Sequence, residues 1–201
     1  MTYKNIIVDK KKGYAVIRFN RAHEMNALSK EMRLEFNDAL LDVENDPEIK
    51  ALVITGGEYV FSAGMDIKEM SLLSNVEIDD YFESMKRYLK KIYTFPKPVI
   101  AAVGGIALGG GFNIVTVCDL IIASESAIFC HPELKFGFSP LFYPLSQIVG
   151  VNKAKEITML GEPIGAKEAE RIGLVNKVAP PEKFMQEAEK MSFAKGIDNF
   201  R

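Results

Sequence analysis

The chain has 201 residues, of which 48% are hydrophobic and 26% are charged, and its formal net charge is −2. These proportions are those of an ordinary globular protein, so collagen-like, disordered and low-complexity classes are excluded. The length suits one domain with a sizeable core. A near-neutral, slightly acidic chain has no positive field for a polyanion, so we expect no nucleic-acid partner.

The two cysteines, Cys118 and Cys130, lie inside apolar segments and form no CxxC pair. They predict buried, reduced thiols in a cytoplasmic protein rather than a disulfide framework. The first residues show no signal-peptide pattern, and no unbroken apolar run reaches the roughly 18 residues of a membrane span. We therefore expect a cytoplasmic protein with no membrane partner.

The N-terminal part of the chain predicts a hairpin, a helix and a buried strand. The β-rich runs at 5–9 and 14–20 are joined by a Lys/Gly turn, which is typical of a hairpin. Residues 29–44 carry apolar side chains at helical spacing, and Ser29 suits the N-cap. Residues 51–55 are the kind of short apolar run that is buried on both faces of a sheet.

The rest of the chain continues to alternate between helices and strands. The expected elements are helix 78–93, strand 99–103, helix 112–118, strands 120–123 and 127–130, helices from residue 139 onward, a strand at 174–178, and a final helix at 181–194. Recurrent strands with helices between them predict an α/β fold rather than an all-α or all-β one.

Two glycine-containing loops each follow an apolar, strand-like segment: FSAGMD at 61–66 and ALGGGFN at 107–113. Glycine lets the backbone approach a ligand closely and adopt positive φ. In the second loop the glycines also open a helix, whose free N–H groups favour negative charge. A single loop of this kind predicts no more than a tight strand-to-helix turn, and neither GxxxxGK[ST] nor GxGxxG fits the spacing.

Taken together, five segments resemble the crotonase superfamily, the enoyl-CoA hydratase/isomerase proteins. The segments are NRAHEMNAL (20–28), FSAGMDIKEM (61–70), GGIALGGGFN (104–113), CDLIIAS (118–124) and AKEAERIGLVNKV (166–178). They occur in the family's order, so the resemblance covers nearly the whole chain. It implies a crotonase-like (ClpP/crotonase) spiral of ββα units as the α/β fold. Residues 1–178 would form the spiral core, and residues 179–201 a C-terminal helical segment that is short for the family.

The resemblance also implies a substrate and its contacts. The substrate is an acyl-CoA thioester, whose enolate is stabilised by two backbone N–H groups that fall by motif position on Met65 and Gly110. A developing oxyanion needs such preorganised donors, and the loss of one costs roughly 3–4 kcal/mol. The resemblance implies no cofactor beyond the coenzyme A of the substrate, no metal, and a homotrimer or hexamer. The implied substrate- and CoA-contacting positions are Met25, Ala27, Leu28, Ala63, Asp66, Ile67, Lys68 and Asn113.

The carboxylates decide which reaction is expected. Hydratases of the family hold one water between two glutamates, and the matching positions here are Asn113 and Glu133. Asn113 cannot take a proton from water, which weakens the two-carboxylate interpretation. Glu133, which has apolar neighbours, is the expected general base. One carboxylate facing an oxyanion hole suffices to move a proton from C2 to C4 of a 3-enoyl thioester, so we expect a Δ3,Δ2-enoyl-CoA isomerase.

Three alternatives stay open. The chain can be an enoyl-CoA hydratase in which Asn113 orients the water, a decarboxylase or hydrolase of the same family, or a catalytically weak acyl-CoA-binding or assembly subunit. Glu133 and the two intact loops favour an enzyme, whereas Asn113 and the short C-terminal segment favour the inactive interpretation. The aromatic residues within 138–143 are expected to narrow the acyl pocket.

Overall fold

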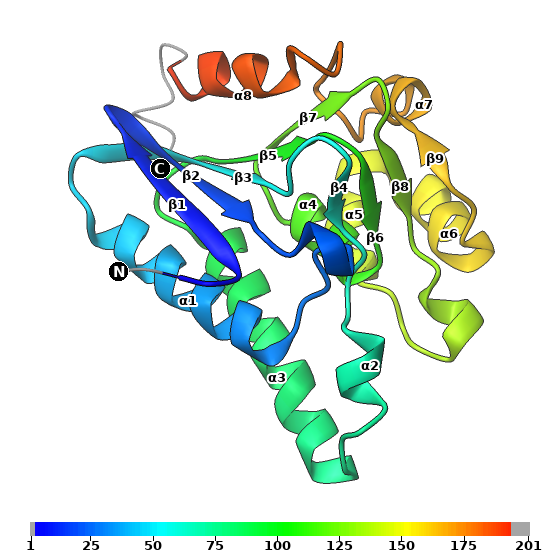
Figure 1. The fold of residues 1–201 in the computed structure, drawn as a ribbon. Coiled ribbons are helices and arrows are strands. Elements are labelled where there is room, and N and C mark those ends of the chain that lie inside the picture. The colour runs from blue at the N-terminus through cyan, green and yellow to red at the C-terminus, as the bar shows by residue number, and fades with distance from the viewer. Residues whose placement is uncertain (1–2, 194–201) are drawn as a thin grey trace.

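The computed structural model describes residues 3–193, whose strands form two sheets (Figure 1). The six-stranded sheet has the order β1 (Ile6–Lys11), β2 (Gly13–Phe19), β3 (Ile49–Thr55), β5 (Val99–Val103), β7 (Leu120–Ser124), β10 (Lys177–Ala179). The four-stranded sheet has the order β4 (Val60–Ser62), β6 (Ile106–Leu108), β8 (Ile128–Cys130), β9 (Ile164–Gly165). The expected α/β class is thus confirmed.

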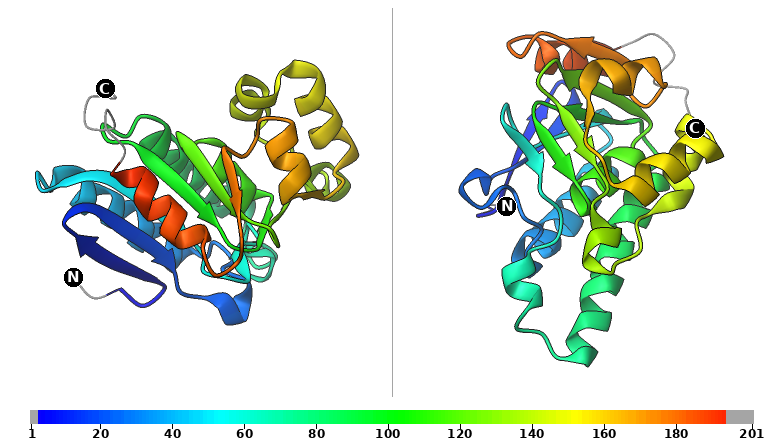
Figure 2. Two further views of the ribbon diagram at one scale, coloured as in Figure 1. Left: turned by 90° about the horizontal axis from the view of Figure 1, so that it is seen from above. Right: turned by 90° about the vertical axis from the view of Figure 1, so that its right-hand side faces the viewer.

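Helices cover both faces of the six-stranded sheet. The helices of the described chain are η1 (Ala22–Glu24), α1 (Lys30–Asn45), α2 (Ile67–Met70), α3 (Asn75–Tyr93), α4 (Gly110–Thr116), η2 (Glu133–Phe136), α5 (Phe142–Val149), α6 (Val151–Leu160), α7 (Ala166–Arg171) and α8 (Phe184–Ser192). Helix α8 lies on one face, and α1 and α3 lie on the other (Figures 1 and 2).

The strands recur as a ββα repeat. After the β1–β2 hairpin, each of the pairs β3/β4, β5/β6 and β7/β8 sends its first strand to the six-stranded sheet and its second to the four-stranded sheet. Successive first strands pair in parallel, and so do β4 with β6 and β6 with β8. The chain therefore winds as a spiral that builds both sheets at once.

Strand β3 shows why the larger sheet needs cover on both faces. Leu52 and Ile54 join the core on the side of α1 and α3, whereas Ala51 and Val53 join the core under α8. All four side chains are fully buried. A parallel strand segment that is buried on both faces is apolar at successive positions, as residues 51–54 of β3 are.

Most of the expected elements are present, but strands β4, β6 and β9 were missed. Strands β4 and β6 have three residues each, which is too short for a periodic signal. Helix α4 begins at Gly110 rather than at residue 112. The strand expected at 174–178 begins later, as β10 (Lys177–Ala179). Leu174 and Val175 are not part of it, because their N–H groups donate to the carbonyl of Ala169 and close a turn.

The C-terminal part of the described chain is continuous with the core. The expected boundary at residue 178 falls inside β10, and α8 packs on β3 and β5. Helix α8 ends at Ser192, and the last residue of the expected helix, at position 194, lies outside the described residues. Between residues 3 and 193 no helix is both long and apolar enough to cross a bilayer.

We predict that Phe36→Ala lowers the free energy of unfolding by about 3–5 kcal/mol, because the fully buried ring leaves a cavity. Phe36 on α1 packs against Phe19 and Tyr88, with ring centroids 5.2 and 5.7 Å away. Leu41→Ala on the same helix should cost less than about 1 kcal/mol, since Leu41 is 45% exposed. Urea unfolding of both variants checks this, and equal losses would contradict the assigned core face of α1.

Candidate active site

Three loops meet at one edge of the four-stranded sheet. Ser62 pairs with Ala107, and Leu108 pairs with Cys130, so the parallel strands β4, β6 and β8 end side by side. Residues 63–66 leave β4, Gly109 follows β6, and residues 131–133 follow β8. The carboxyl edge of parallel strands is where α/β proteins commonly bind ligands.

Glycine allows the first two loops to touch through their backbones. Gly64 has a φ of +88°, and a Cβ there would lie 2.7 Å from the backbone nitrogen of Gly110. A Cβ at Gly111 would lie 2.3 Å from the carbonyl oxygen of Ser62. Only glycine permits this approach, so the glycines predicted to matter for a ligand are first required by the contact between the loops.

The peptide between Gly64 and Met65 is fixed in orientation. The N–H of Leu28 donates to the carbonyl of Gly64 at 2.8 Å, and the peptide bond is trans. The N–H of Met65 therefore points away from Leu28. Within the described part of the chain, neither this N–H nor that of Gly110 donates a hydrogen bond. Both residues line one cavity, so two free backbone donors flank it.

That cavity has a volume of about 320 Å³. Its lining residues are Ala63, Met65, Ile67, Met70, Ser71, Ile78, Gly109, Gly110, Pro132, Glu133, Phe136 and Phe138. Most of these are apolar, and among the described residues that line the cavity only Glu133 is ionisable. A largely apolar cavity with a few converging polar groups is typical of a small-molecule site.

Glu133 is held at this cavity by a neighbouring histidine. It is 6% exposed, and a Cβ at Gly109 would lie 3.5 Å from its Oε1. The Nδ1 of His131 lies 3.1 and 3.2 Å from the two carboxylate oxygens. When this carboxylate is ionised it only accepts hydrogen bonds, and Nδ1 is then the donor of the pair. His131 is fully buried and stacked on Phe112, with ring centroids 4.4 Å apart. The packed imidazole in turn holds the Glu133 carboxylate in place.

Asn113 lies apart from this arrangement. Its side chain is buried on α4, and it is absent from the residues that line the cavity. The Oδ1 of Asn113 and the Nε2 of His131 have no hydrogen-bond partner among the described residues. The structure thus leaves two buried polar atoms unsatisfied close to the chain segments that form the site.

The other predicted CoA-contacting positions are divided between the cavity and its surroundings. Ala63 and Ile67 line the cavity, together with Met65. Asp66 instead caps α2 by accepting from the N–H of Glu69, and it lies 3.4 Å from Arg21. Met25 and Lys68 are exposed, Ala27 is half-buried and Leu28 is buried; none of the four lines the cavity.

Sequence analysis missed Asn26, which organises the loops. Its Nδ2 donates to the carbonyls of Gly56, Val60 and Phe61 at 2.9–3.2 Å, and its Oδ1 accepts from the N–H of Arg21. Its φ is +50°, a conformation that Asn tolerates better than most residues. An Asn inside NRAHEMNAL, between two turn-forming segments, is the signal that could have identified it.

Comparisons with known proteins agree with this arrangement. Residues 9–195 match the family model described as enoyl-CoA hydratase/isomerase. The chain is 42% identical to a crotonyl-CoA hydratase of Syntrophomonas wolfei and 39% identical to a short-chain-enoyl-CoA hydratase of Clostridium acetobutylicum. Both alignments cover 96% of this chain and 75% of the relative.

Solved structures show the same fold. An enoyl-CoA hydratase from Bacillus anthracis superposes with a TM-score of 0.91 at 31% identity, over 94% of this chain and 75% of that one. An enoyl-CoA hydratase/isomerase from Xanthobacter autotrophicus also gives 0.91, at 35% identity, over 100% of this chain and 75% of that one. The crotonase-like spiral expected from the sequence is therefore confirmed.

We predict that Asn26→Ala lowers the free energy of unfolding by at least about 2 kcal/mol, because buried backbone groups lose their partner. Asn152→Ala, at an exposed position of α6, is the control and should change it by less than about 0.5 kcal/mol. Chemical denaturation measures both. An Asn26→Ala protein as stable as the control would contradict the organising role of this side chain.

Proposed function

This chain belongs to the enoyl-CoA hydratase/isomerase family, and from that premise we propose that its cavity binds the acyl thioester of an enoyl-CoA substrate. One observation carries the proposal: the two free N–H groups of Met65 and Gly110 and the carboxylate of Glu133 border the same apolar cavity. Donors preorganised in a water-poor site stabilise an enolate oxygen far better than water does.

We propose hydration of a short-chain 2-enoyl-CoA as the reaction. The printed names of the relatives, crotonyl-CoA hydratase and short-chain-enoyl-CoA hydratase, support this choice over the isomerisation expected from the sequence. A cavity of about 320 Å³ suits a short acyl chain. Coenzyme A enters as part of the substrate, and the reaction needs no other cofactor.

One carboxylate can carry both proton transfers of hydration. Glu133 takes a proton from water as the water oxygen bonds to C3, and the electron pair of the C2–C3 bond moves onto the thioester oxygen. The N–H groups of Met65 and Gly110 hold the resulting enolate. Glu133 then returns the proton to C2, so that one water has been added. Asn113, if it reaches the water, can orient it but cannot accept its proton.

Isomerisation of a 3-enoyl-CoA is the second candidate. Two observations favour it. By the family resemblance, Asn113 takes the sequence position of the hydratases' second glutamate, and among the described residues that line the cavity Glu133 alone is ionisable. In this reaction Glu133 takes the C2 proton and returns it to C4, and the same two N–H groups hold the dienolate.

A homotrimer or hexamer stays a prediction for this chain. Met159 and Leu160, near the end of α6, are 68% and 58% exposed, and such apolar exposure supports self-association.

We predict that Glu133→Gln lowers kcat for the active reaction by at least about 100-fold, since the acid–base group is lost. Gln still accepts a hydrogen bond from His131, so the site should stay folded. Acyl-CoA at about 100 times its Kd should still stabilise the variant by about 2.7 kcal/mol, which a thermal shift detects. Glu162→Gln, an exposed control, should keep wild-type turnover. Full activity of Glu133→Gln would exclude Glu133 as the base.

We predict that Asn113→Ala separates the two candidate reactions. Hydration of crotonyl-CoA should fall by about 10-fold or more if the amide orients the water, whereas isomerisation of a 3-enoyl-CoA needs no water and should change little. Steady-state rates on both substrates check this. A variant that loses isomerisation and keeps hydration would contradict the assigned role of Asn113.

A further inference from the structure

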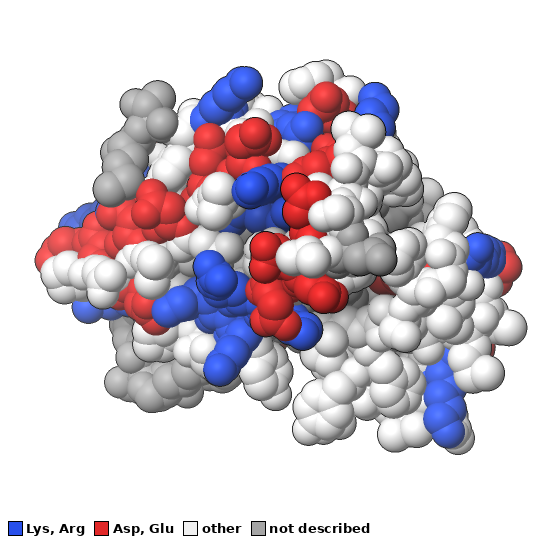
Figure 3. All heavy atoms as spheres, turned by 90° about the horizontal axis from the view of Figure 1, so that it is seen from below, with Lys and Arg blue, Asp and Glu red and all other residues white. Residues whose placement is uncertain are grey.

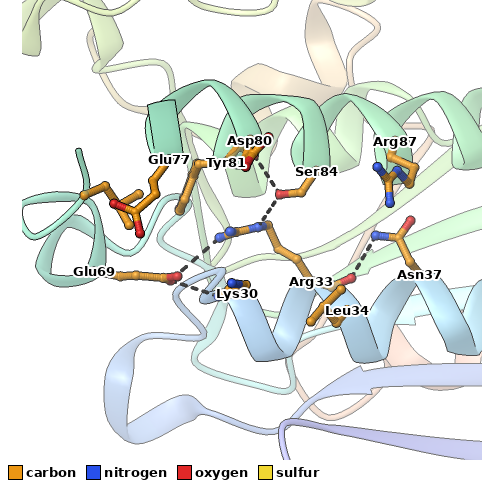
Figure 4. Close-up of a pocket in the computed structure, with 11 residues that line it drawn as sticks. Lys30, Arg33, Leu34, Asn37, Glu69, Glu77, Asp80, Tyr81, Ser84 and Arg87 are labelled. Carbon is orange, nitrogen blue, oxygen red and sulfur yellow. Dashed lines mark hydrogen bonds and ion pairs between the residues drawn. The ribbon is translucent and has the colours of Figure 1, made fainter. Parts of the chain in front are cut away.

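A polar network joins helices α1, α2 and α3, with Arg33 linked to Ser84 and Glu69 (Figure 4). Through Tyr81 it also reaches the loop that carries Met65. It borders a hollow of about 130 Å³ in which Arg33 and Tyr81 face each other. The surface over α1 and α3 mixes acidic and basic side chains (Figure 3), among them Lys30, Asp80 and Arg87 around the hollow. Such mixed charge does not favour the binding of a polyanion. We therefore look for the role of the network in the backbone segments that it holds.

The network fixes the second peptide beside Met65. The first, between Gly64 and Met65, is held by the N–H of Leu28. The second, between Met65 and Asp66, is held because the N–H of Asp66 donates to the hydroxyl of Tyr81 at 3.1 Å. Both planes that flank the Cα of Met65 are therefore held: Leu28 holds the plane that contains the Met65 N–H, and Tyr81 holds the plane that follows it.

Leu28 is in turn anchored by both helices. Its carbonyl accepts a hydrogen bond from the Tyr81 hydroxyl at 3.3 Å and another from the Arg33 guanidinium at 2.5 Å. Burial raises the pKa of Tyr81 to about 12, so its hydroxyl keeps the proton that it donates. The Tyr81 hydroxyl thus bridges the two chain segments by accepting from one and donating to the other.

Arg33 is built into this position. It is 3% exposed, and its guanidinium lies 3.7 Å from the centroid of the Tyr81 ring. Its Nε donates to the hydroxyl of Ser84 at 2.7 Å, and Glu69 lies 3.8 Å away. Burying a guanidinium is unfavourable unless it is paired and hydrogen-bonded, and here its partners come from α2, α3 and the loop before α1.

We infer that Tyr81 and Arg33 are positioning residues of the oxyanion hole, which hold the N–H of Met65 toward the cavity through Leu28 and Asp66. The inference rests on the proposed function for its effect on catalysis. Neither side chain lines the cavity, so neither touches the substrate. Replacing either side chain should therefore weaken transition-state stabilisation by changing the orientation of the Met65 N–H.

The same helix supplies a matched control. Tyr88 is fully buried on α3 and packs against Phe36, but its hydroxyl has no hydrogen-bond partner among residues 3–193. Tyr81→Phe and Tyr88→Phe therefore each remove a tyrosine hydroxyl from α3. The first hydroxyl belongs to the polar network, and the second lies in the apolar core.

The experiment measures the thermal stability of both variants, and their kcat and KM on whichever of the 2-enoyl-CoA and 3-enoyl-CoA substrates the wild type converts faster. Tyr81→Phe should lower kcat by about 10-fold to 100-fold and change KM by less than about 2-fold, because a misaligned oxyanion donor affects the transition state most. Tyr88→Phe should match the wild type in kcat. Equal kcat values for the two variants, or a Tyr81→Phe loss confined to KM, would overturn the inference.

A second measurement does not depend on turnover. Hydrogen exchange of the Asp66 amide should be at least about 10-fold faster in Tyr81→Phe than in wild type and unchanged in Tyr88→Phe, since only the first loses the acceptor. Unchanged exchange in Tyr81→Phe would overturn the inference. If the wild type turns over neither substrate while exchange responds as expected, the proposed function fails and the positioning contact stands. Arg33→Lys, which keeps the charge, should shift kcat in the same direction as Tyr81→Phe.

Discussion

The close approach of the backbone at Gly64 and Gly110 is the constraint on which the site depends. A Cβ at Gly64 would lie 2.7 Å from the nitrogen of Gly110, so the two loops can meet only without side chains at this point. The approach is possible because β4 and β6 are parallel neighbours in the four-stranded sheet. The ββα spiral supplies that pairing and leaves the N–H groups of Met65 and Gly110 free at one cavity.

Buried polar side chains hold this backbone arrangement in place. Asn26 binds carbonyl groups of β4 and of the turn before it, Arg33 and Tyr81 hold Leu28, and His131 holds Glu133. Each is at most 3% exposed, and burying such groups is favourable only when they are hydrogen-bonded. The Nε2 of His131 and the Oδ1 of Asn113 are exceptions, since neither atom has a hydrogen-bond partner among the described residues.

Sequence reasoning identified the features that are local. The continuous apolar run of β3 predicted a strand buried on both faces, and the two glycine loops predicted where a backbone could approach a ligand. Strands β4 and β6 were missed because each has three residues and overlaps a glycine loop, whereas β8, of the same length, was predicted. The roles of Asn26 and Tyr81 were also missed, because Asn26 binds carbonyl groups 30–35 residues away and Tyr81 binds groups 15 and 53 residues away along the chain. The resemblance set the register of Glu133, but its pairing with a buried histidine required the structure.

The central claim is that two main-chain N–H groups bind the thioester oxygen opposite Glu133. The most direct test is a crystal structure of Glu133→Gln with a short-chain 2-enoyl-CoA bound. The account predicts the thioester oxygen about 2.7–3.1 Å from the nitrogens of both Met65 and Gly110, with C2 facing residue 133. A thioester oxygen that contacts neither nitrogen, or an acyl group bound outside the cavity, would contradict it.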